Sequence, residues 1–145
     1  MAFKFKEIKI YKNILKEKEE IKLVSIIKEK EILNEEIKQA EIKYKSTQSK
    51  IRDLYTKNFN ISLVQLYNDN LQNIVENIQK IENEIKKVDK KITEQKIIIK
   101  NATIEFKKFE KLEENYIKER NEKIKYNEKK ELDETVSIRE FHNKD

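Results

Sequence analysis

A narrow apolar stripe through the middle of this 145-residue sequence limits what the chain can fold into. Steps of alternately three and four residues, from Val64 to Phe109, reach fourteen positions, of which thirteen are apolar or aromatic. Gln95 is the only interruption. A mean spacing of about 3.5 residues is that of a left-handed coiled coil, so this stretch is predicted to be one long helix packed along a partner helix. The positions are Val64, Tyr67, Leu71, Ile74, Ile78, Ile81, Ile85, Val88, Ile92, Gln95, Ile99, Ala102, Phe106 and Phe109.

A shorter stripe with the same spacing precedes it, between Leu33 and Leu54. Upstream of Leu33 the apolar residues are less regular and allow more than one apolar face. A stutter near residues 28–30, which is a local change in the repeat, would bring both patterns into one helix. The sequence therefore predicts a first helix over about residues 3–57.

The best candidate for a break lies at residues 58–62, where Asn58 and Asn60 flank Phe59 and Ser62 follows. Asparagine tolerates the left-handed backbone conformation that often ends a helix, and serine is a favourable N-cap. We therefore expect a turn here, with Ser62 as the cap of a second helix over about residues 62–140. One unbroken helix is the alternative that the residues leave open.

A short turn between two such stripes folds the second helix back along the first. The predicted fold class is therefore all-α, a long antiparallel two-helix coiled-coil hairpin that forms a single domain over residues 1–145. After Phe109 the alternating steps reach Glu113, whereas the apolar residues nearby are Leu112, Tyr116 and Ile117. We expect the stripe to shift by one position there, and the last turns of the second helix to overhang the first or meet its N-terminal segment.

Several residue types that are common in catalytic and metal sites are absent from the sequence or occur once. It contains no cysteine, no glycine and one histidine, His142, near the end of the chain. Neither a Gly-rich phosphate loop nor a metal-ligand spacing is present, so we expect no enzyme activity, no cofactor and no metal site. No apolar run of about eighteen residues exists, so no membrane span is predicted. The N-terminus does not have the pattern of a secretory signal.

Charge is distributed unevenly along the chain. Residues 58–85 carry one lysine against four acids, whereas residues 1–30 have a net charge of +4 and residues 86–130 a net charge of +6. The overall charge of +5 is compatible with binding to nucleic acid, which is negatively charged. Against that role, 28 acidic residues are interspersed among 33 basic ones and no compact basic stripe stands out. We therefore expect no nucleic-acid partner.

Three segments resemble the FliJ family of flagellar export proteins. They are the opening FKFKEIKIYKNILKEKEE, the segment KKFEKLEENYIKER at residues 107–120, and EKKELDETVSIR at residues 128–139. In the last segment, Leu132, Asp133, Glu134 and Arg139 match the family's C-terminal signature. The resemblance implies a cytoplasmic protein, peripheral to the cell membrane at the flagellar base, with a role in type III secretion, protein transport, flagellum biogenesis, motility and chemotaxis.

By this resemblance, the chain is a stalk in the pore of the hexameric flagellar export ATPase. It promotes assembly of that ring, contacts the export gate protein FlhA, assists export chaperones and is a monomer when free. An equivalent stalk of a virulence type III secretion system and a purely structural coiled-coil scaffold are the alternatives. The ATPase contact is expected at Phe3, Phe5, Leu132, Asp133, Glu134 and Arg139, and the gate contact at Tyr55, Tyr67, Asn70, Leu71 and Ile74.

Overall fold

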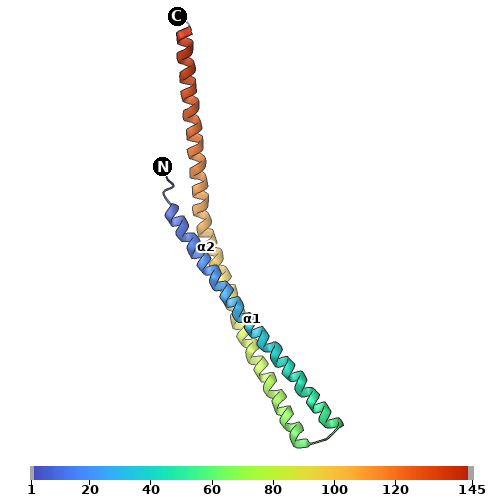
Figure 1. Cartoon of the computed structure of the whole chain (residues 1–145). Helices are drawn as coiled ribbons and strands as arrows, with labels where there is room; N and C mark the ends of the chain where they lie inside the picture. Colours follow the sequence, from blue (N-terminus) through green and yellow to red (C-terminus); the bar gives the residue numbers. More distant parts are fainter. Residues whose placement is uncertain (1, 144–145) are drawn as a thin grey trace. The chain divides into compact units, whose positions relative to one another are not determined.

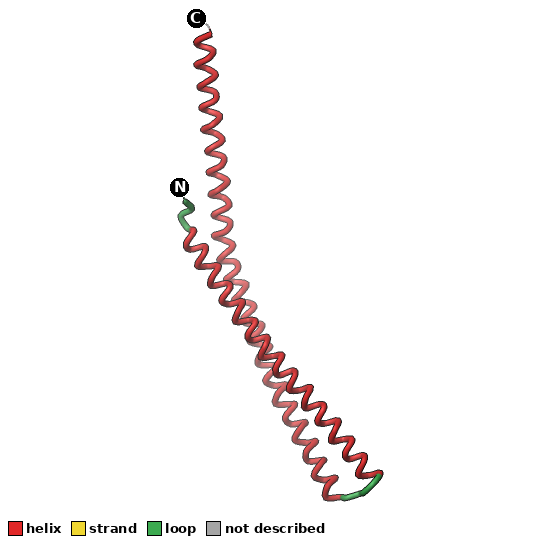
Figure 2. The backbone as a smooth tube through the Cα atoms, in the orientation of Figure 1, coloured by secondary structure: helices red, strands yellow, loops and turns green. Residues whose placement is uncertain are grey.

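The structure, a computed structural model, describes residues 2–143 and consists of two long helices. Helix α1 spans Lys6–Thr56 and helix α2 spans Ile61–Asn143 (Figure 1). A short connection at residues 57–60 reverses the chain, so that α2 runs back along α1 (Figure 2). The described residues contain no strand. The predicted all-α antiparallel two-helix hairpin is therefore confirmed, and the single unbroken helix is wrong.

The connection differs from the expected one in its capping residue. The side-chain Oδ1 of Asn60 accepts hydrogen bonds from the backbone N–H groups of Ser62 at 3.1 Å and Leu63 at 3.3 Å. The Asn60 carbonyl oxygen also accepts a bond from Val64 N at 3.0 Å. Asn60 is thus the N-cap of α2, in place of Ser62, because its side chain satisfies two of the free N–H groups of the first turn. None of the described residues has a positive φ, so the turn uses no left-handed residue.

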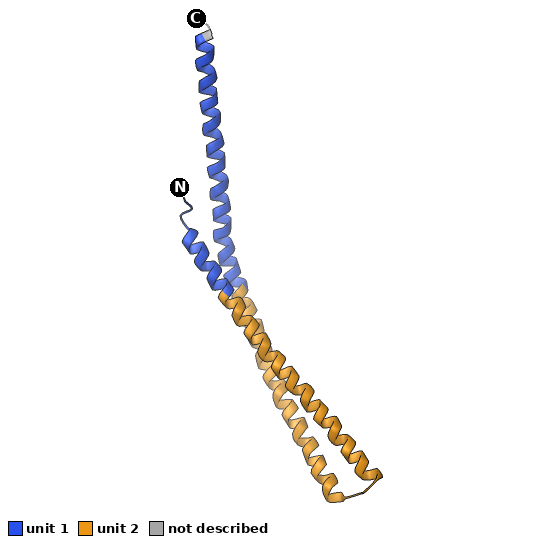
Figure 3. Cartoon of the chain, in the orientation of Figure 1, with its two compact units in different colours: residues 1–17, 100–145 blue, residues 18–99 orange. Residues whose placement is uncertain are grey.

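The chain divides into two compact units, residues 18–99 and residues 1–17 with 100–145, which Figure 3 colours orange and blue. In the unit of residues 18–99, the stripe positions of α2 all face inward. Val64, Ile81 and Val88 are buried and the other apolar positions are half-buried. On α1 the predicted positions from Leu33 to Leu54 are also buried or half-buried. The predicted stripes are therefore the packed surfaces of this unit.

The inward face of α1 in the same unit also continues upstream of Leu33. Lys30, Ile26, Leu23 and Glu19 extend the alternating spacing and are half-buried, so no stutter occurs near residues 28–30. Lys30 pairs with Asp89 of α2 at 2.7 Å. Ile21, which is 71% exposed, and Val24 lie on the opposite, outer face of the helix. The irregular apolar pattern therefore arose because charged residues occupy inward positions and apolar residues occupy outward ones.

The other unit packs the start of the chain against α2 through an aromatic cluster of Phe3, Phe5, Phe109 and Tyr116. The ring centroids of Phe3 and Tyr116 are 5.7 Å apart, and those of Phe5 and Phe109 are 6.0 Å apart. Beside this cluster, Lys9 Nζ forms an ion pair with Glu113 Oε1 at 3.3 Å. Glu113 and Tyr116 are half-buried and thus continue the inward-facing positions of α2 after Phe109, while Leu112 and Ile117 are exposed.

The expected shift of the stripe after Phe109 is therefore wrong. Lys9 provides a charged partner for Glu113, so the inward position does not need an apolar residue there. Beyond Tyr116, every side chain of α2 from Ile117 to His142 is exposed. The alternating positions in that segment are polar or charged up to Ser137, and the next one, Phe141, is 70% exposed, which suits a helix that has no partner within this unit. The polar and charged positions are Arg120, Lys123, Asn127, Lys130, Glu134 and Ser137.

Candidate functional site

An exposed aromatic pair lies at the turn. Tyr55, in the last turn of α1, is 61% exposed, and Phe59 of the connection is exposed to a similar extent. Their ring centroids are 5.4 Å apart with an interplanar angle of 38°. The two rings shield one another only in part, and each presents apolar surface to solvent. Such exposed aromatic surface is typical of protein contact sites.

The other predicted gate-contact residues lie at the start of α2 and differ in accessibility. Tyr67, Leu71 and Ile74 are half-buried, because they belong to the stripe that packs on α1. Asn70 is exposed. Within the predicted gate set, Tyr55 and Asn70 are therefore accessible to a partner, whereas the other three also hold the hairpin together.

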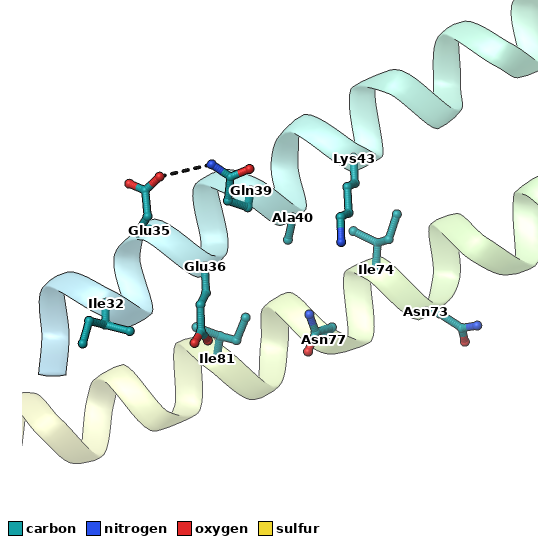
Figure 4. A pocket seen from close by; sticks show the side chains of 10 residues that line it. All are labelled: Ile32, Glu35, Glu36, Gln39, Ala40, Lys43, Asn73, Ile74, Asn77 and Ile81. Carbon is teal, nitrogen blue, oxygen red and sulfur yellow. Dashed lines mark hydrogen bonds between the residues drawn. The ribbon is translucent and has the colours of Figure 1, made fainter.

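A groove of about 600 Å³ opens between α1 and α2 next to this set, with which it shares Ile74 (Figure 4). Ala40, at 6% exposure, is the buried residue of α1 in the described structure and the smallest on its inward face. Its short side chain leaves space above Ile74 and Ile81 of α2. Sequence reasoning missed this groove, although an alanine within a stripe of leucine, isoleucine and tyrosine was a signal for it. The lining residues are Ile32, Glu35, Glu36, Gln39, Ala40, Lys43, Asn73, Ile74, Asn77 and Ile81.

The polar side chains of the groove are arranged around Ala40. Glu36 and Lys43 extend from α1 toward α2 on either side of Ala40, and Asn77 extends from α2 into the same space (Figure 4). Glu35 and Gln39 turn away from α2 and are joined by a hydrogen bond of 3.2 Å, donated by the Gln39 amide. The groove thus has an apolar floor, an amide on one wall and one charge of each sign on the other.

The residues predicted to contact the ATPase form two separate sets in the unit of residues 1–17 and 100–145. Phe3 and Phe5 are half-buried within the aromatic cluster. The second set lies on the segment of α2 from Ile117 to His142, whose side chains are all exposed and which is called the free segment below. It consists of Leu132, Asp133, Glu134 and Arg139. Leu132 follows Tyr116 by sixteen residues, which places it about 24 Å along the helix from the aromatic cluster. The first set therefore packs the chain end, and the second is open to a partner.

A row of lysines follows the outer face of α2 in this unit. Lys111, Lys118 and Lys125 are spaced seven residues apart and are exposed, and Lys107 lies one turn before them. Helical residues four and seven apart share a face. This row was not recognised from the sequence, because acidic residues alternate with the lysines along the chain. The neighbouring Lys108 is instead paired with Glu105 at 3.0 Å, and this hydrogen bond is the main reason that the pKa of Glu105 is lowered.

No arrangement suited to catalysis is found among the described residues. They contain no group of three His, Cys, Asp or Glu side chains that could hold a metal ion. The carboxyl groups whose pKa departs from the ordinary value, Glu19 and Glu105, are both lowered, chiefly by hydrogen bonds from Gln95 and Lys108. A lowered pKa stabilises the ionised form of a carboxylate and does not make it a better general acid. No helix in the described part of the chain is both long and apolar enough to cross a membrane.

Comparison with known proteins identifies the family of this hairpin. No curated protein and no solved structure matches the chain. The model of the family described as "Flagellar FliJ protein" matches residues 2–145, which is almost the whole sequence. The match includes the start of the chain, the turn and the free segment of α2, so it does not rest on coiled-coil periodicity in one region alone. The chain therefore belongs to the flagellar FliJ protein family.

Proposed function

We propose that this protein is the stalk of the flagellar type III export apparatus, which inserts into the hexameric export ATPase and links it to the export gate protein FlhA. The observation that carries the proposal is the family match over residues 2–145. Family membership makes the chain a non-enzymatic component of flagellar protein export, as predicted. The match to a flagellar family favours this system over a virulence secretion system.

The unit of residues 1–17 and 100–145 is the proposed ATPase-binding end. Its free α2 segment is a single helix with every side chain exposed from Ile117 to His142, which suits insertion into a narrow protein pore. The lysine row of Lys111, Lys118 and Lys125 would attract an acidic pore lining. Such attraction acts over about 8 Å at physiological salt and mainly speeds association. Leu132, Asp133, Glu134 and Arg139 would supply the specific contacts.

The turn end is the proposed gate contact. Tyr55 and Asn70 are accessible there, and Phe59, which packs beside Tyr55, extends the aromatic surface. Half-buried Tyr67, Leu71 and Ile74 would contribute through their exposed edges. Export chaperones are the third class of proposed partner. In this proposal the protein is a monomer when free and works in the cytoplasm, at the membrane face beneath the flagellum.

The test is a titration of the protein into the export ATPase of the same organism, with ATP hydrolysis and ring assembly followed together. We expect stimulation that saturates near one copy per six ATPase subunits. The variant Lys111→Glu/Lys118→Glu/Lys125→Glu should need much more protein for the same stimulation. Lys38→Glu/Lys45→Glu/Lys50→Glu reverses three exposed lysines of the other unit and is the matched control. Absence of stimulation by the wild-type protein at low salt would overturn the stalk proposal.

A further inference from the structure

A short strap, residues 2–5, precedes α1 and lies against α2 (Figure 2). Its Phe3 ring packs on Tyr116, with ring centroids 5.7 Å apart, and its Phe5 ring packs on Phe109 at 6.0 Å. We infer that this strap is an autoinhibitory contact, which covers Phe109 and Tyr116 in the free protein and gives way to an apolar side chain of the export ATPase when that partner binds. The inference rests on the proposed function and concerns its regulation.

The strap covers part of an apolar face of α2. Phe109, Leu112 and Tyr116 are three and four residues apart, so they share one face of the helix. Phe109 and Tyr116 are half-buried in contact with the strap, whereas Leu112 between them is 45% exposed. An open strap would therefore leave a continuous apolar face over two turns of α2, which a partner can bury.

Few contacts hold the strap closed. The backbone N–H of Lys6 donates a bond of 3.3 Å to the Phe3 carbonyl oxygen, and Ala2 and Lys4 are exposed. Ordering these residues outside a helix costs conformational entropy, which offsets much of the gain from two partly exposed ring contacts. The closed and open forms therefore differ little in free energy, and a partner that binds the open form shifts the balance toward it.

Helix α1 holds α2 in this unit without help from the strap. Lys9 Nζ pairs with Glu113 Oε1 at 3.3 Å, and Lys12 Nζ lies 3.9 Å from Glu105 Oε2. Both lysines belong to α1 itself, so their ion pairs do not depend on the strap. The strap can therefore open while the two helices stay packed in this unit.

The position of the strap favours the export ATPase as the partner that opens it. The free segment begins at Ile117, directly after the ring that Phe3 covers. A partner that surrounds the free segment would therefore meet the strap at the next turn of α2. Lys4 and Lys6 are exposed and have no ion-pair partner among the described residues. Acidic groups of the pore lining would attract these two lysines and draw the strap away from α2.

The test uses full-length variants in the ATPase titration described above. Phe3→Cys/Tyr116→Cys, in a sequence without other cysteines, holds the strap closed by a disulfide when oxidised and releases it when reduced. Lys30→Cys/Asp89→Cys places a disulfide between α1 and α2 in the other unit, where the native side chains form an ion pair of 2.7 Å, and is the matched control. Phe3→Ala/Phe5→Ala removes both rings and so favours the open strap, and circular dichroism verifies that its helices remain.

We expect the oxidised strap variant to need at least fivefold more protein for half-maximal stimulation than the same variant when reduced, because only the open form binds. Oxidation of the control variant should change this concentration less than twofold. Phe3→Ala/Phe5→Ala should need at least threefold less protein than the wild type.

Two results would overturn the inference while the wild type still stimulates the ATPase, which leaves the proposed function standing. One is equal stimulation by the oxidised and reduced forms of the strap variant. The other is weaker stimulation by Phe3→Ala/Phe5→Ala than by the wild type, which is expected if these rings contact the ATPase directly. Absence of stimulation by the wild type would instead overturn the proposed function, and the inference with it.

Discussion

The side-chain amide of Gln95 donates two hydrogen bonds to Glu19, one to its backbone carbonyl oxygen at 2.9 Å and one to its carboxylate Oε2 at 2.6 Å. Gln95 is 7% exposed and occupies a stripe position of α2, while Glu19 occupies an inward position of α1. The interruption of the apolar stripe is thus a satisfied polar contact between the helices. A single polar residue in a coiled-coil core typically fixes the register of the helices and lowers their stability.

Replacement of Gln95 by leucine should therefore stabilise the hairpin and weaken its register. We expect a gain of about 1 kcal/mol in the free energy of unfolding, measured by urea denaturation, because apolar surface replaces a polar group in the core. The register is measured by disulfide formation between two introduced cysteines. Lys30→Cys is combined with Asp89→Cys, which reports the native register, or with Glu82→Cys or Lys96→Cys, which report registers shifted by seven residues. In the wild-type background only the disulfide 30–89 should form, whereas in the Gln95→Leu background the disulfide 30–82 or 30–96 should form as well. A native pair alone in both backgrounds would contradict the register role.

The same contact predicts a pH dependence of stability. The pKa of Glu19 is lowered below its ordinary value of 4.5, first by the hydrogen bond from Gln95 and further by Lys22. A carboxyl group with a lowered pKa in the folded state stabilises the fold above its unfolded pKa, and this contribution is lost as the pH falls through the folded pKa. The melting temperature of the wild-type protein should therefore fall more steeply below pH 4.5 than that of Glu19→Gln. Parallel pH profiles for the two proteins would show that the Gln95 contact carries no such contribution.

The sequence predicted the packed surface well where apolar residues alone build it. From Val64 to Phe109 all fourteen positions given by the spacing are buried or half-buried, because a period near 3.5 has one face that can be buried. It failed at Lys30 and Glu113, which occupy inward positions through ion pairs with Asp89 and Lys9. Long charged side chains pack their aliphatic stems inward and reach a partner at the edge. Such positions are identified only when the register of the opposite helix is known.

The candidate sites were predictable to a smaller degree. Tyr55 was predicted to contact the gate, which requires an accessible side chain, and it is 61% exposed. The burial of Phe3 and Phe5 in the aromatic cluster depends on which residues of α2 lie opposite the chain end, which one helix does not reveal. The groove at Ala40 likewise results from a small residue on α1 and the residues that face it on α2. Features that depend on one helix alone could therefore be predicted from the sequence, whereas features formed by residues of both helices could not.

A charge placed at the centre of the stripe should unfold the hairpin. Ile85 is half-buried between the buried residues Ile81 and Val88, so Ile85→Asp puts an unpaired carboxylate next to the core. We expect a loss of about 3 kcal/mol in the free energy of unfolding and a clear drop in helicity at about 37 °C, measured by circular dichroism. The neighbouring residue Lys86 is exposed, and Lys86→Asp is the control with the same new side chain. Equal melting temperatures for the two variants would show that Ile85 does not belong to the packed stripe.

Deletion of residues 131–145 should weaken binding to the ATPase without unfolding the hairpin. The side chains of the described part of this segment, up to residue 142, are all exposed, so the deletion removes no core residue. We expect a melting temperature within a few degrees of the wild type. Binding to the export ATPase, measured by surface plasmon resonance, should weaken at least tenfold because Leu132, Asp133, Glu134 and Arg139 are lost. A large fall in the melting temperature would instead assign the segment a structural role.

Substitution at the turn should affect the gate contact and leave ATPase binding unchanged. Tyr55→Ala removes an exposed ring that packs on Phe59, so its cost to stability should be below about 0.5 kcal/mol. Because exposed aromatic residues carry much of the energy of protein contacts, we expect at least a tenfold loss of affinity for the cytoplasmic part of the gate. Tyr67 is half-buried in the stripe, so Tyr67→Ala should lower stability as well as gate binding. Tyr55→Phe is the matched control, since it keeps the ring and removes only the hydroxyl group. If Tyr55→Ala weakens gate and ATPase binding equally, or neither, the turn is not the gate-binding end.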